Sequence, residues 1–129
     1  MKDFRQLKVW GKAHALTLEV YRTTSAFPRD EIFGITSQMR RSSASIAANL
    51  AEGCGRTGDG DFHRFLDIAA GSVVELEYFL LLSRDLGLLR TNIYEQLQDS
   101  IVEVRRMLGS LLLPSTEPAG TGNWLVARC

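Results

Sequence analysis

Proline occurs at only three positions in this chain, Pro28, Pro114 and Pro118. Proline inside a helix removes a backbone hydrogen bond and clashes with the preceding turn, so the long proline-free segments leave room for long helices. Within these segments the apolar residues recur every three or four positions, which is the period of an amphipathic α-helix. No segment shows the alternation that is typical of a half-buried strand. The sequence therefore predicts an all-α fold.

The first two predicted helices lie on either side of Pro28. The first ends near Ser25, and its expected buried stripe consists of Phe4, Leu7, Trp10, His14, Leu18 and Tyr21. The second is capped by Asp30 and stops at Gly53, because aspartate is common at helix N-caps and glycine is common just beyond helix C-termini. Its expected buried face consists of Ile35, Met39, Ile46 and Leu50. The glycines of residues 55–60 predict a flexible loop after it.

The third and fourth predicted helices fill the chain up to Pro114. Asp59 or Asp61 caps the third, whose wide apolar arc consists of Phe62, Phe65, Leu66, Ala69, Val73, Leu76 and Leu80, with Phe79 and Leu82 on a flanking row. Thr91 or Asn92 caps the fourth, whose stripe consists of Ile93, Leu97, Ile101, Val104, Leu108 and Leu111. Short links make consecutive helices antiparallel neighbours. The sequence thus predicts one up-down-up-down four-helix bundle over residues 1–113.

The wide apolar arc of the third helix is more than one four-helix core needs, which predicts contacts between subunits. Residues 114–129 are predicted to form a flexible tail, since Pro118, Gly120 and Gly122 preclude a stable helix there. The tail carries a small apolar cluster, Trp124–Val126. Two interpretations of this cluster stay open: a frayed terminus, or a short peptide that docks on another subunit.

Charge and cysteine content narrow the functional classes. Fifteen Lys and Arg residues balance fifteen Asp and Glu residues, so non-specific binding of polyanions is not the default expectation. Two cysteines, Cys54 and Cys129, do not make a disulfide framework. The charged N-terminus has no apolar signal core, and the longest apolar run, Tyr78–Leu82, is far too short to span a bilayer. The sequence predicts a cytoplasmic protein without a membrane partner.

Residues able to carry catalysis are scarce. The only histidines are His14 and His63, and neither has the Glu three positions earlier that a di-iron bundle site requires. His63 with Asp59 or Asp67 makes at most one edge of a metal site. The glycines around Cys54 follow a helix, whereas the dinucleotide-binding motif follows a strand. We therefore expect no enzymatic activity, no metal and no cofactor.

The most informative polar pattern lies on the second predicted helix. Its members share one helical face by their three- and four-residue spacing, and two residues of the third helix can meet them; together they are Gln38, Arg41, Ser45, Asn49, Glu52, Ser72 and Glu75. One interpretation is a satisfied polar network within or between subunits, in which Arg41 is better covered than Arg40. The alternative is a groove for a ligand or a nucleic acid. Separately, the candidate contacts to nucleic acid are Lys12, Arg40, Arg56 and Arg64.

Several blocks of the chain resemble the four helix bundle protein family, which includes the 23S rRNA-intervening sequence proteins. The blocks are Phe4-x-x-Leu7-x-Val9-Trp10, Tyr21, Phe27-Pro28-x-x-Glu31-x-Phe33-Gly34, Gln38-Met39-Arg40-Arg41-Ser42-Ser43-x-Ser45-Ile46-x-x-Asn49-Leu50-Ala51-Glu52-Gly53, and Phe65-Leu66-x-Ile68-Ala69-x-Gly71-Ser72-x-x-Glu75-Leu76. The resemblance covers about residues 4–112.

The resemblance implies the same bundle and adds a ring-like homopentamer as the assembly. It also implies a relation to accessory proteins of diversity-generating retroelements, which act with a reverse transcriptase and its RNA, and it implies no enzymatic activity. Three hypotheses follow, and the third, a small-molecule or metal-dependent enzyme, has few residues to support it. The first is a non-catalytic homo-oligomer that binds RNA or a nucleic-acid enzyme such as a reverse transcriptase. The second is a purely structural or protein-interaction module without a nucleic-acid role.

Overall fold

The computed structural model describes residues 3–113. The predicted tail over residues 114–129, with its Trp124–Val126 cluster, lies outside the described residues. Within residues 3–113 there are four α-helices and two short 3-10 helices but no strand, so the all-α prediction is confirmed. The elements are η1 (Phe4–Gln6), α1 (Lys8–Thr24), η2 (Arg29–Glu31), α2 (Ile35–Cys54), α3 (Asp59–Asp85) and α4 (Thr91–Leu112).

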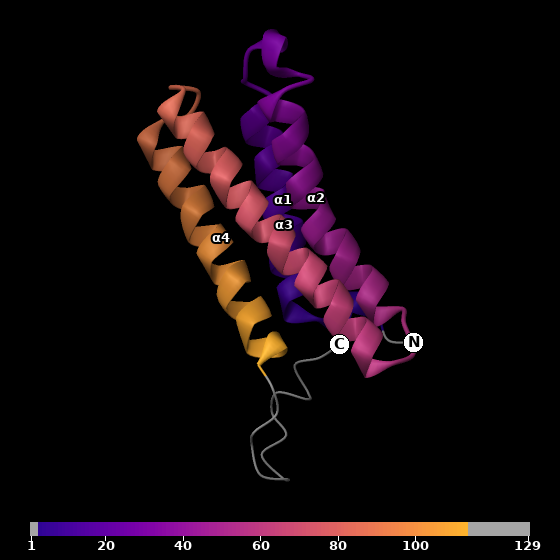
Figure 1. The fold of residues 1–129 in the computed structure, drawn as a ribbon. Helices are drawn as coiled ribbons and strands as arrows, with labels where there is room; N and C mark the ends of the chain where they lie inside the picture. Colours follow the sequence, from indigo (N-terminus) through magenta and orange to yellow (C-terminus); the bar gives the residue numbers. More distant parts are fainter. Residues whose placement is uncertain (1–2, 114–129) are drawn as a thin grey trace.

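The four α-helices run up, down, up and down along one axis (Figure 1). Each helix packs against its neighbours in the chain, and α1 also packs against α4, which closes the bundle. The α1–α2 connection and the α3–α4 turn lie at one end, while the α2–α3 loop lies at the other. The predicted four-helix bundle is therefore confirmed. None of the helices in the described part of the chain has an apolar stretch suited to crossing a membrane.

The core lies between the four helices, and most of its residues were predicted from the sequence. On α3 and α4 the buried positions follow the predicted stripes closely; they are Phe62, Phe65, Leu66, Ala69, Val73, Leu76, Leu80, Leu97, Ile101, Val104, Leu108 and Leu111. On α2 the predicted face is also buried, and it is extended by the small residues Ser42, Ser43 and Ala47. Small side chains let the backbones of neighbouring helices approach each other.

The predicted stripe of α1 is wrong beyond Trp10, which is half-buried and packs against the core. The buried face consists instead of Val9, Ala13, Leu16, Val20 and Thr24, whereas His14, Leu18 and Tyr21 are exposed. The error arises because the first turn is not α-helical. Phe4 belongs to the short η1, and Leu7 is the N-cap of α1, so a helical count that starts at Phe4 leaves the buried face after Trp10.

The predicted N-caps of the later helices are also wrong by a few residues. The N-cap positions of α2, α3 and α4 are Gly34, Gly58 and Arg90. Asp30 lies in η2, and the neighbouring Glu31 carboxylate accepts a hydrogen bond from the Ile35 N–H at 3.4 Å. Helix boundaries depend on such local choices, which periodicity does not resolve.

Gly53 lies inside α2 rather than beyond its end. A Cβ placed on it would lie 3.1 Å from Cβ of Phe65, so glycine at this position allows α3 to pack closely against the last turn of α2. The helix continues to Cys54, which is buried against the core and is not the loop residue that the sequence suggested. Close packing thus overrides the usual role of glycine as a helix terminator.

Candidate functional site

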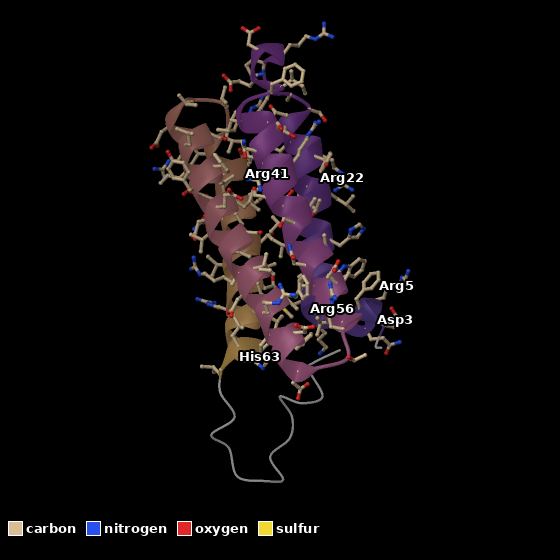
Figure 2. The ribbon with its side chains drawn as sticks, turned by 45° about the vertical axis from the view of Figure 1, so that its right-hand side comes forward. Asp3, Arg5, Arg22, Arg41, Arg56 and His63 are labelled. Carbon is tan, nitrogen blue, oxygen red and sulfur yellow. The ribbon has the colours of Figure 1, made fainter. Side chains whose placement is uncertain are left out.

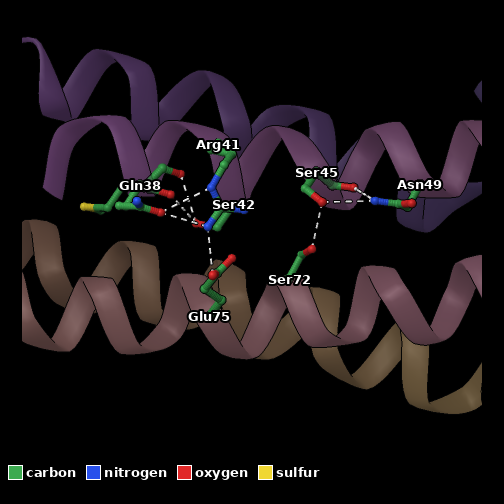
Figure 3. Close-up of polar contacts among 8 residues, drawn as sticks. Gln38, Arg41, Ser42, Ser45, Asn49, Ser72 and Glu75 are labelled. Carbon is green, nitrogen blue, oxygen red and sulfur yellow. Dashed lines mark hydrogen bonds and ion pairs between the residues drawn. The ribbon is translucent and has the colours of Figure 1, made fainter. Parts of the chain in front are cut away.

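The predicted polar row lies along the seam between α2 and α3 (Figure 3). At its first cluster, Nη2 of Arg41 lies 2.7 Å from Oε2 of Glu75. The Arg41 guanidinium also donates from Nε and Nη2 to Oε1 of Gln38, at 3.2 and 2.9 Å. Gln38 thus orients the arginine within α2, and Glu75 ties it to α3.

A second cluster lies about one helical turn further along the same seam (Figure 3). The hydroxyl oxygens of Ser45 and Ser72 are 2.8 Å apart and share a hydrogen bond. Nδ2 of Asn49 donates to the Ser45 carbonyl oxygen at 2.8 Å and to its hydroxyl oxygen at 3.0 Å. The structure brings together six of the seven residues of the predicted network in these two clusters. The seventh, Glu52, instead pairs with Arg56 at 2.7 Å.

The first cluster is half open to solvent in a single chain. The side chains of Arg41 and Glu75 are 53% and 40% exposed. Arg40 is the better covered of the two neighbouring arginines, contrary to the sequence-based expectation. Its Nε donates to the Thr24 hydroxyl at 2.9 Å, and its guanidinium lies 4.8 Å from the ring centre of Tyr21.

We expect Arg41→Ala to lower the free energy of unfolding of a single chain by at most about 1 kcal/mol, because exposed ion pairs contribute little. Urea unfolding at low protein concentration measures this loss. The matched control is Arg106→Ala, which removes an exposed arginine that has no ion pair within the described residues. A loss several times larger at a concentration where the chain assembles would show that a second subunit covers the pair. A large loss in the isolated chain would contradict the half-open geometry.

Arg56 and Arg64 lie together at the α2–α3 end of the bundle. Their guanidinium carbons lie 5.0 and 4.4 Å from the ring centre of Phe65, so one aromatic ring supports both cations. Each arginine also has a carboxylate neighbour, since Arg56 pairs with Glu52 at 2.7 Å and Arg64 with Asp61 at 3.6 Å. We define these three residues, Arg56, Phe65 and Arg64, as the arginine–Phe65 cluster.

Sequence reasoning missed the role of Phe65. Its spacing marks it as a core position, and it is indeed mostly buried. No spacing rule connects it to Arg56, which lies in the loop before α3. The contact follows from the close approach of α3 to Gly53, which places Phe65 beneath the loop.

The other two predicted cationic candidates lie apart from this cluster. Nζ of Lys12 pairs with Oε1 of Glu103 at 3.0 Å, across the α1–α4 seam. Arg40 lies near the start of α2, whereas Arg56 follows its end, and Figure 2 shows the neighbouring Arg41 and Arg56 at different levels of the bundle. Of the four predicted candidates, Arg56 and Arg64 lie together, whereas Lys12 and Arg40 each lie at a separate position.

The histidines make aromatic contacts. The His14 ring stacks on Trp10 with 5.0 Å between ring centres and 7° between planes, and His63 meets Phe62 edge-on at 6.3 Å. Within residues 3–113, no group of three or more His, Cys, Asp or Glu side chains is arranged to hold a metal ion. The candidate sites in the described residues are therefore the polar row between α2 and α3 and the arginine–Phe65 cluster.

Sequence comparison agrees with this architecture. The sequence model of the 23S rRNA-intervening sequence protein family matches residues 5–110, which is most of the bundle. The chain belongs to this family. The residues that match the 23S rRNA-intervening sequence protein model include both clusters of the polar row and the arginine–Phe65 cluster.

A solved structure supports the family assignment. It is a protein of unknown function from the S23 ribosomal protein family of Bacteroides thetaiotaomicron. The two chains share 25% sequence identity, and their folds superpose with a TM-score of 0.74 over 82% of this chain and 99% of the other. No curated protein matches the chain. The family match and the structural similarity thus agree on a four-helix fold and on membership of this family.

Proposed function

We propose that this 23S rRNA-intervening sequence protein is a non-catalytic homo-oligomer, with five subunits in a ring, that binds RNA as an accessory factor of a nucleic-acid enzyme such as a reverse transcriptase. The arginine–Phe65 cluster carries the RNA-binding part of the proposal. The exposed apolar face of α3 carries the self-association part. Neither part requires a catalytic residue or a cofactor.

The outer face of α3 supports self-association. Gly71, Val74, Tyr78 and Leu81 are exposed at spacings of three, four and three residues, which draw one straight stripe along the helix. Val74 and Tyr78 are 60% and 56% exposed, so the stripe is apolar surface that the bundle leaves uncovered. Contiguous exposed apolar surface of this kind is typical of a protein interface.

The outer face of α1 offers a matching surface. Gly11, Ala15 and Leu18 are exposed there at spacings of four and three residues, and a Cβ at Gly11 would meet no atom within 4 Å. Lys8 and Arg22 border this face, whereas Asp67 and Asp85 lie on the line of the α3 stripe, beyond its two ends. Arg22 already pairs with Glu19 at 2.6 Å, and Asp85 pairs with Arg84 at 3.1 Å, so Lys8 and Asp67 are the better candidates for a contact between copies. Opposite charges at the ends of the two faces favour contact of α1 in one copy with α3 in the next. Such a head-to-tail contact generates a ring when the rotation closes.

The arginine–Phe65 cluster supports RNA binding. Guanidinium groups match phosphate geometry, and the Phe65 ring keeps two of them side by side next to the glycine-rich loop. Glu52 and Asp61 offset part of this charge, and the chain as a whole is neutral. Several copies of the cluster on one assembly compensate for weak binding at each copy.

The test is a gel-shift or fluorescence titration of a structured RNA across a salt series. Replacing Arg56 and Arg64 together with Ala is expected to weaken binding at least tenfold for many RNA sequences and to lower the salt slope by about two, since each phosphate contact contributes about one. Arg90→Ala with Arg106→Ala removes the same charge elsewhere and is the matched control. Unchanged affinity in the cluster variant would contradict the assignment of the cluster, provided that light scattering shows an intact assembly.

A second candidate function is a purely structural or protein-interaction module. The observation that favours it is the carboxylate neighbour of each arginine in the cluster, which is the arrangement of an ordinary solvated surface. A parent chain that assembles but binds no RNA at low salt would favour this second function.

A further inference from the structure

A pocket of about 290 Å³ lies where α1 ends and α2 begins. This end of the bundle is opposite to the α2–α3 loop, which borders the arginine–Phe65 cluster (Figure 1). The pocket is lined by residues that include Phe27, Pro28, Arg29, Ile32, Thr36 and Arg40. The pocket thus combines two guanidinium groups with an apolar wall.

Arg40 is a cation held by neutral hydrogen-bond acceptors. Its Nε donates to the Thr24 hydroxyl at 2.9 Å, and its Nη2 reaches the Tyr21 carbonyl oxygen at 3.5 Å. Among residues 3–113, no carboxylate forms an ion pair with Arg40 or with Arg29. A guanidinium that is already oriented loses little side-chain freedom when it binds an oxyanion, and its remaining donors match that ligand.

Thr36 adds a second polar feature at the same place. It is the second residue of α2, where backbone N–H groups have no partner within the helix and the helix dipole favours an anion. Its side chain is only 2% exposed, and within the described residues its hydroxyl has no hydrogen-bond partner. Buried polar groups are nearly always paired, so this hydroxyl in a residue of the pocket wall is a spare hydrogen-bonding group that a ligand reaches only when the wall shifts.

We propose that this pocket binds one phosphate group carried on a small organic body. Arg29, Arg40 and the start of α2 supply the donors for the phosphate, while Phe27, Pro28 and Ile32 supply an apolar wall for the body. The volume is at the lower limit of ligand pockets, which excludes a large ligand. A free phosphate monoester and the 5′ end of an RNA strand share this chemistry.

The acidic residues of η2 limit the affinity. Asp30 and Glu31 lie on the same turn as Arg29, and Glu31 already contacts the first N–H of α2. Long-range attraction is therefore weak, and we expect a millimolar dissociation constant for inorganic phosphate. The site does not depend on RNA binding by the arginine–Phe65 cluster, because the two lie at opposite ends of the bundle.

The experiment is an NMR titration of backbone amide shifts in the full chain with inorganic phosphate at constant ionic strength. We expect saturable shifts at residues 35–40 and at Arg29. Arg40→Gln is expected to weaken phosphate binding at least tenfold, and Thr36→Val severalfold. Arg106→Gln, which removes an exposed arginine elsewhere, is the matched control and is expected to bind as the parent does. Unshifted amides elsewhere in the Arg40→Gln spectrum verify its fold.

Two short RNAs that differ only in a 5′-phosphate or a 5′-hydroxyl group then distinguish the sources. Stronger shifts with the phosphorylated strand would identify RNA ends as ligands of the pocket. Binding of inorganic phosphate without this difference would identify a free small phosphate. No saturable shift at residues 35–40, or equal phosphate affinity in Arg40→Gln and the parent, would overturn the proposal. Loss of RNA binding in the Arg56 and Arg64 double variant with phosphate binding retained would separate this site from the proposed function.

Discussion

Leu16→Ala is expected to lower the free energy of unfolding by about 2–5 kcal/mol, whereas Leu18→Ala is expected to lower it by about 0.5 kcal/mol. The two leucines lie two residues apart on α1. Leu16 is 1% exposed and Leu18 is 42% exposed. Truncating Leu16 leaves a cavity between α1 and the rest of the bundle, but truncating Leu18 leaves none. Urea unfolding monitored by circular dichroism measures both losses.

This pair of variants decides which face of α1 packs inward. Each variant is the control of the other, because the chemical change and the helix are the same. The measurement belongs at a protein concentration where the chain is monomeric, since a subunit contact through Leu18 would otherwise add to its apparent loss. A larger loss for Leu18→Ala than for Leu16→Ala would mean that the stripe expected from the sequence is the buried one.

The α1 stripe shows where periodicity reaches its limit. A three- and four-residue spacing locates a helix well, but two adjacent stripes of α1 both carry apolar residues. Leu18 and Tyr21 are large and suggest that the stripe that carries them is the buried one, whereas the stripe that is in fact buried contains the small Ala13. Small residues are buried there because α1 packs closely on α2, where the Thr17 hydroxyl reaches the Ser43 carbonyl oxygen at 3.0 Å. Close packing of this kind is a tertiary property.

The candidate sites also differ in how far they could be predicted from helical spacing. Contacts between α2 and α3, such as Arg41 with Glu75, were predictable because each residue shares a helical face with its cluster. The arginine–Phe65 cluster was predictable only as separate parts, since a loop residue meets a helix residue there. The pocket beside Arg40 was not predictable, because it depends on how η2 leads the chain from α1 into α2.

A chain carrying Val74→Glu and Tyr78→Glu is expected to stay monomeric at concentrations where the parent chain assembles. Two added carboxylates on the outer face of α3 place charge in a desolvated contact next to Glu75 and Glu77, which we expect to weaken association at least a hundredfold. Sedimentation velocity is expected to give the variant a mass near 14.4 kDa. Phe33→Glu with Leu86→Glu adds the same charge at exposed apolar positions away from this face and is expected to assemble as the parent does.

A mixing experiment tests the head-to-tail geometry itself. Leu18→Glu blocks the α1 face and leaves α3 intact, whereas the Val74→Glu and Tyr78→Glu chain leaves α1 intact. Each variant alone is expected to be monomeric, but their mixture has one intact pair of faces and is expected to form a heterodimer that cannot grow. A self-complementary α3–α3 contact gives the opposite result, because the Leu18→Glu variant would then dimerise alone and the mixture would add nothing. A parent chain that stays near 14.4 kDa at micromolar concentration would contradict both geometries.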